Sequence, residues 1–194
     1  MLLKEKIVRE SLKLFSLKGF LSTSLHDILK AAGTSKGGFY NHFQSKEDLF
    51  YHVMDLARKI WREKNLAGMD DTRQPAEKIK KLLENFKNRY LLDAENFPGG
   101  CVFITLSVEL NDQRPHLSKE ISKGFTGLKK MLKRLLDQSK HEGVLAKGVD
   151  TAKAAEILFA GLLGASVIYG ADKSGTCLDN SINALLNYLE SIRI

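Results

Sequence analysis

Three side chains that can donate a hydrogen bond to a phosphate follow a pair of glycines in the first quarter of this 194-residue chain. They are the phenol of Tyr40, the imidazole of His42 and the ammonium of Lys46, and the glycines are Gly37 and Gly38. A glycine inside a helix costs about 1 kcal/mol relative to alanine, so two in succession need a reason. Bare backbone permits close approach by another molecule, and the donors beside it suit a partner that carries phosphates.

The elements that must position these groups are helices. Apolar periodicity predicts an all-α protein of nine helices, over residues 3–18, 24–33, 35–41, 45–64, 75–93, 101–110, 115–141, 150–170 and 178–192. The stretch CVFITLSVEL at 101–110 also alternates like a strand. We expect a helix there because no partner strand is visible elsewhere.

The second and third of these helices have the layout of a helix-turn-helix. The motif SLHD starts the pair with a capping box, and Gly33 makes the turn. In such a unit the second helix enters the major groove of DNA. Lys36 can present its ammonium to the O6 and N7 acceptors of a guanine. Phe39 and Phe43 are expected to pack inward against the helices at 3–18 and 45–64.

The composition is that of an ordinary globular protein with a basic balance. The chain has 43% hydrophobic and 27% charged residues, and its formal net charge of +7 is compatible with an anionic partner. The longest apolar run, residues 157–171, is shorter than the ~20 residues that span a bilayer. The charged N-terminus lacks the apolar core of a signal peptide. We therefore expect a cytoplasmic protein.

Sequence motifs for catalysis are missing. The five histidines lack metal-ligand spacing such as HExxH, and the chain contains no GxGxxG, Walker loop or Gly-x-Ser-x-Gly elbow. We expect no enzyme activity, no cofactor and no metal. A helical architectural protein that binds DNA without sequence preference is the alternative class.

The stretch LFSLKGFLSTSLHDILKAAGTSKGGFYNHFQSKEDLF, residues 14–50, resembles the N-terminal signature of the TetR family of bacterial transcriptional regulators. The resemblance implies a DNA-binding domain over 1–48 and an effector-binding and dimerisation domain over 49–194. It also implies a homodimer through the eighth and ninth helices, a small-molecule cavity among the fourth to eighth, and release of DNA when that cavity fills. The expected protein is a ligand-responsive repressor of this kind; an activator or a co-repressor-dependent variant of the same fold is an alternative that the sequence does not separate from it.

Carried over onto this chain, the family's DNA contacts fall on ten positions. The resemblance implies phosphate contacts at Thr23, Ser24, Tyr40, His42 and Lys46, base-edge contacts at Ser35, Lys36 and Gly37, and further contacts at Thr34 and Gly38. The basic stretch around 119–140 resembles a second nucleic-acid patch, but a solvated helix face is the preferred interpretation.

Two further sets of residues are candidates for the ligand and the partner subunit. Aromatic side chains that can line an apolar cavity, or else form plain core, are Phe86, Tyr90, Phe103, Phe125 and Phe159. Residues expected at the dimer seam, with packing inside one subunit as the alternative, are Gly161, Gly164, Ala165, Ile182, Leu185 and Leu189.

Cys101 begins a predicted helix directly after two glycines. A thiol at a helix N-terminus can have a lowered pKa and react with oxidants or electrophiles. The alternative is a buried, inert thiol.

Overall fold

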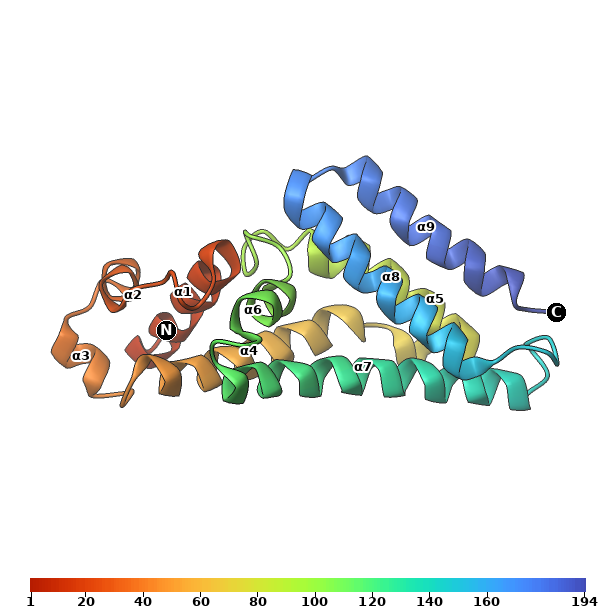
Figure 1. The fold of residues 1–194 in the computed structure, drawn as a ribbon, viewed down its shortest axis with the longest axis horizontal. Coiled ribbons are helices and arrows are strands. Elements are labelled where there is room, and N and C mark those ends of the chain that lie inside the picture. The colour runs from red at the N-terminus through yellow and green to blue at the C-terminus, as the bar shows by residue number, and fades with distance from the viewer. The chain divides into compact units, whose positions relative to one another are not determined.

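The computed structural model describes residues 1–194 and is built of α-helices, which confirms the all-α prediction (Figure 1). The nine α-helices are α1 (Leu3–Lys18), α2 (Leu25–Ala32), α3 (Lys36–Tyr40), α4 (Lys46–Asn65), α5 (Pro75–Asn85), α6 (Val102–Leu110), α7 (Pro115–His141), α8 (Thr151–Asp172) and α9 (Gly175–Ser191). A 3-10 turn, η1 (Met69–Asp71), lies between α4 and α5, and a π-helix, η2 (Phe86–Leu91), follows α5.

Most expected helices are confirmed, including the ambiguous stretch that becomes α6. The fifth is different, because its last turn and a half widens into the π-helix η2 instead of continuing as α-helix to residue 93. The ninth starts three residues earlier than expected. There the Ser174 hydroxyl accepts a hydrogen bond from the amide N–H of Cys177 and caps the helix.

Packing divides the chain into two compact units. The first comprises Met1–Trp61 and Asp93–Ile121, and the second comprises Arg62–Leu92 and Ser122–Ile194. The functional boundary at residue 48 stays a prediction. By packing, the first unit also contains most of α4 and all of α6, because α6 packs against α1.

Aromatic rings fill the core of the first unit. Phe20 lies edge-on to Phe15 and to Phe50, with ring centroids 5.4 Å apart in each pair. Phe39 and Phe43 are buried as predicted. The Phe43 ring contacts His52 of α4 and lies under the ammonium of an α1 lysine. These contacts tie the short helix α3 to its neighbours.

In the second unit, α8 and α9 run side by side and α5 packs against α9 (Figure 1). A Cβ on Gly161 would overlap the Leu185 side chain, so the small residue lets α8 and α9 approach closely. Arg193, after α9, bonds the carboxylates of Glu77 at 2.8 Å and Glu190 at 3.1 Å. The Glu77 bond is the main reason why the pKa of Arg193 is raised.

Candidate nucleic-acid interface

The start of α2 is fixed by the predicted capping box. The Ser24 hydroxyl accepts from the amide N–H of Asp27 at 3.1 Å, and the Asp27 carboxylate accepts from the amide N–H of Ser24 at 2.8 Å. The same carboxylate meets the Lys18 ammonium at 2.8 Å. Hydrogen bonds from Lys18, then from Ser24, hold the pKa of Asp27 well below its usual range. The cap and the ion pair therefore link the end of α1 to the start of α2.

Helix α3 presents the predicted reading residues. Gly33 ends α2 in the left-handed conformation at φ 63°, and Ser35 caps α3 by accepting from the amide N–H of Gly38 at 3.1 Å. Lys36 is exposed, and Tyr40 is 50% exposed with its ring edge-on to Phe39. His42 is exposed just beyond the helix.

The two glycines of α3 differ in how much space the fold leaves for a side chain. A Cβ on Gly38 would overlap the Thr34 hydroxyl, so the fold restricts that position. A Cβ on Gly37 would meet only the Ser35 hydroxyl, at an ordinary 3.8 Å. Gly37 is also exposed and does not have a positive φ. Nothing inside the molecule therefore requires a glycine at position 37.

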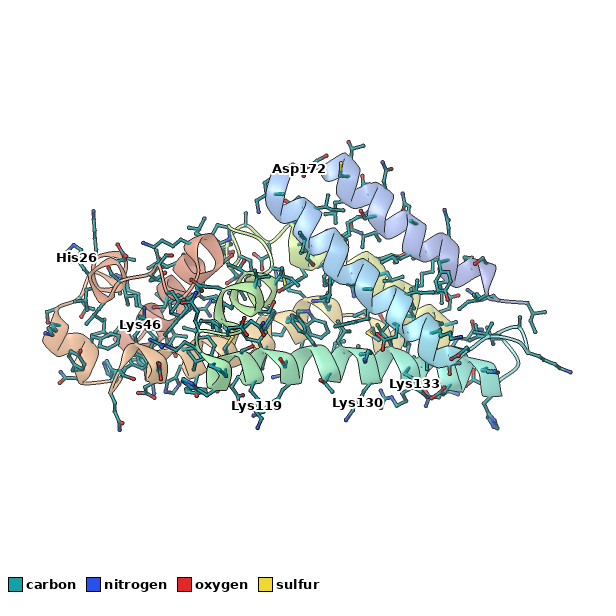
Figure 2. The ribbon with its side chains drawn as sticks, in the orientation of Figure 1. His26, Lys46, Lys119, Lys130, Lys133 and Asp172 are labelled. Carbon is teal, nitrogen blue, oxygen red and sulfur yellow. The ribbon has the colours of Figure 1, made fainter.

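Two predicted phosphate contacts have internal partners. The Thr23 side chain is buried, and its hydroxyl donates to the carbonyl of Gly19 at 2.6 Å. The Lys46 ammonium donates to the carbonyls of Phe20 at 2.9 Å and Thr23 at 2.8 Å, and the side chain, labelled in Figure 2, is half-buried. Burial lowers the pKa of Lys46. Contact of either residue with DNA stays a prediction, and both act here on the turn between α1 and α2.

Glu109 of α6 is a residue of this site that the sequence pattern did not indicate. Its carboxylate accepts hydrogen bonds from the amide N–H groups of Phe20 at 2.6 Å and Leu21 at 2.9 Å. These partners are 89 and 88 residues away in the chain, beyond the range of any local pattern. The one available signal is that Glu109 is the only charged residue of CVFITLSVEL.

The aromatic candidates for a ligand site fall into both units. Phe86 and Tyr90 are buried in the π-helix with centroids 5.5 Å apart, and the Phe125 and Phe159 rings lie 6.0 Å apart across α7 and α8. All four belong to the second unit, whereas Phe103 belongs to the first. Contact of these side chains with a ligand stays a prediction.

The candidate sensor Cys101 is a buried residue at the N-cap of α6. Cys177 is exposed at the start of α9. The predicted basic stretch lies along α7, where Lys130 and Lys133 are exposed (Figure 2).

Most residues expected at the dimer seam are buried within one chain. Ala165, Ile182, Leu185 and Leu189 are at most 7% exposed. Their burial favours the alternative, which is packing of α8 against α9 inside the subunit. A Cβ on Gly164, in contrast, would meet no atom within 4 Å.

A different face of α8 is apolar and uncovered. Its exposed or half-exposed residues recur at helical spacing and are Ile157, Ala160, Gly164, Val167 and Ile168. By length and composition alone, helix α8 is long and apolar enough to cross a membrane, and a third of its most apolar 18 residues is buried within the chain. A single helix of this kind is weak evidence for a membrane, because a core helix of a globular protein can have the same length and apolar composition.

The capped α2, the left-handed turn and the exposed α3 define a helix-turn-helix DNA-binding protein. The family model "Bacterial regulatory proteins, tetR family" matches residues 7–53, and "Tetracyclin repressor-like, C-terminal domain" matches residues 75–185. The chain belongs to the TetR family. It is a ligand-responsive, DNA-binding transcriptional regulator and not an enzyme; regulators of this family bind operator DNA as dimers.

Relatives with similar sequences and folds cover nearly the whole chain. An uncharacterised HTH-type transcriptional regulator from Lactococcus lactis is 27% identical over 97% of this chain and 94% of its own. A TetR regulator from Chloroflexus aurantiacus is 26% identical, with a TM-score of 0.89 over 99% of this chain and 96% of its own. The reduced form of Escherichia coli NemR, a transcriptional repressor, is 21% identical, with a TM-score of 0.75 over 99% and 97%.

Proposed function

We propose that this protein is a cytoplasmic repressor that binds a near-palindromic operator as a homodimer and leaves it when a small apolar or amphipathic molecule binds. In this proposal one α3 from each subunit enters successive major grooves about 34 Å apart. The main support for this proposal is the environment of Gly37 in α3. Gly37 is a helical glycine that the protein's own packing does not need, which supports close approach of DNA to its backbone.

The proposed dimer contact is the exposed apolar stripe of α8, together with the exposed face of α9. Ile157, Val167 and Ile168 are 46%, 53% and 45% exposed in one chain. Large apolar side chains that share a face are covered in most stable proteins. A second copy of the same helix pair supplies a matching surface by two-fold symmetry.

The proposed effector site is in the second unit, around the π-helix. The paired rings of Phe86 and Tyr90, and of Phe125 and Phe159, offer an apolar lining that favours an apolar or amphipathic ligand. Such a ligand shifts the protein off DNA only by its higher affinity for a conformation with wrongly spaced α3 helices.

The experiment that tests this function is fluorescence anisotropy with DNA from upstream of the protein's own gene, in excess random competitor. We expect binding that survives the competitor and that falls when an apolar compound or a fatty acyl thioester is added. If random DNA displaces the protein as well as upstream DNA does, it is an architectural protein and not a specific repressor.

Electrophiles form a separate arm of that experiment, because they test Cys101. If an electrophile releases DNA from the wild type and not from Cys101→Ser, the thiol is the sensor. Equal release from both proteins would leave Cys101 as an inert, buried side chain.

The exposed side chains of α3 are expected to have different roles, Tyr40 as a phosphate contact and Lys36 as a base contact. Tyr40→Ala should weaken binding to all DNA sequences by a similar factor, because a phenol on a phosphate reads no sequence. Lys36→Ala should cost about 1–3 kcal/mol on the cognate site and less on random DNA, because it loses a base contact. Titrations of both variants on both DNAs measure the division, and indistinguishable patterns would contradict it.

A further inference from the structure

The turn between α1 and α2, residues 19–24, is held by a carboxylate that comes from α6. The two oxygens of Glu109 accept from the consecutive amide N–H groups of Phe20 and Leu21, at 2.6 and 2.9 Å. A Cβ on Gly19, which has φ 82°, would overlap this carboxylate. The glycine therefore gives Glu109 the space to reach the backbone.

The backbone carbonyls of the same turn accept hydrogen bonds from a cation. The Lys46 ammonium donates to the carbonyls of Phe20 and Thr23 and lies 4.3 Å from the centroid of the Phe20 ring. The turn thus has a negative group on its N–H side and a positive group on its carbonyl side. Hydrogen bonds with one ionised partner are roughly twice as strong as neutral ones, so this pair fixes the turn firmly.

The segment before α6 also contacts the end of α1. The amide N–H of Gly99 donates to the Ser16 hydroxyl at 3.0 Å, and that hydroxyl donates to the carbonyl of Gly100 at 3.0 Å. A Cβ on Gly99 would overlap the Ser16 backbone, so the two backbone segments are in direct contact. The stretch from Gly99 to Glu109 therefore bonds the end of α1 just before α6 begins, and bonds the following turn near the end of α6.

From this geometry we propose that Glu109 is a positioning residue for operator binding. It touches no DNA, and it acts by fixing the turn from which α2 and α3 start. The family model places Glu109 in the C-terminal domain, yet its packing places it in the unit that binds DNA. The proposal rests on the DNA-binding function and adds to it a residue from outside the helix-turn-helix.

The test is Glu109→Gln, which keeps the side-chain shape and removes the charge and one of the two acceptors. The matched control is Val108→Gln, a change at the adjacent position of α6, where the side chain is 78% exposed. We expect Glu109→Gln to bind operator DNA at least tenfold more weakly, with an unchanged slope of log affinity against log salt because no phosphate contact is lost. The control should bind like the wild type.

A second measurement separates positioning from general instability. Amide hydrogen exchange in Glu109→Gln should become faster at Phe20 and Leu21 and stay unchanged in α8 and α9, with the helical circular dichroism signal retained. Operator affinity within twofold of the wild type would overturn the proposal, and so would weaker binding that follows loss of helical structure. If the wild type itself fails to bind DNA, the proposed function fails instead.

Discussion

A Val167→Glu variant is expected to be a monomer and to lose most of its operator affinity. Val167 is the most exposed large side chain of the α8 stripe, so a dimer built on that stripe would bury two unpaired carboxylates, one from each subunit. A buried, unpaired charge costs several kcal/mol. We expect the dimer dissociation constant to rise at least a thousandfold, as measured by analytical ultracentrifugation across micromolar concentrations.

Ala152→Glu is the matched control for this change. Residue 152 is also exposed on α8, but it lies off the stripe and in the first turn, where a carboxylate suits the helix dipole. This variant should remain a dimer and bind DNA like the wild type. A Val167→Glu protein that still sedimented as a full dimer would move the interface away from the α8 stripe.

A Gly37→Ala variant is expected to show opposite changes in stability and in function. The added methyl group meets only an ordinary contact with Ser35, so the free energy of unfolding should stay the same or increase by up to about 1 kcal/mol. Operator affinity should fall tenfold or more, because the methyl group occupies the space proposed for DNA. Urea unfolding and anisotropy titration measure the two quantities.

Gly124→Ala is the control for the helix-propensity part of that prediction. Gly124 is exposed within α7, and a Cβ there would meet no atom within 4 Å. Its alanine variant should be more stable by a similar amount and should bind the operator normally. If Gly37→Ala bound as well as Gly124→Ala, DNA would not approach the backbone of α3 at that position.

The local part of the fold could be predicted from the sequence because its causes lie within a few residues. The SLHD box, the left-handed Gly33 and the bounds of α1 and α7 depend on caps and periodicity that can be read in one window. The π-helix could not be predicted in this way. It results from a change of hydrogen-bond register that leaves the apolar spacing of 75–93 nearly intact.

The features that the sequence did not predict, the open face of α8 and the role of Glu109, depend on long-range packing. Helix α8 is apolar on nearly all sides, so periodicity could not show which face packs on α9 and which stays open. The predicted seam accordingly contained Ala165 of α8, which is 2% exposed in one chain. Glu109 was missed for the same reason, since its partners are almost half the chain length away.

The discontinuous first unit also has a consequence for biosynthesis. The ribosome makes the helix-turn-helix early, but the segment 93–121 that completes its packing emerges only after α5 and η2 have been made. Domains generally fold as units during translation, and distant contacts form late. The nascent DNA-binding region therefore waits for more than half of the chain, so its final folding is linked to the synthesis of α5 and η2, which belong to the second unit.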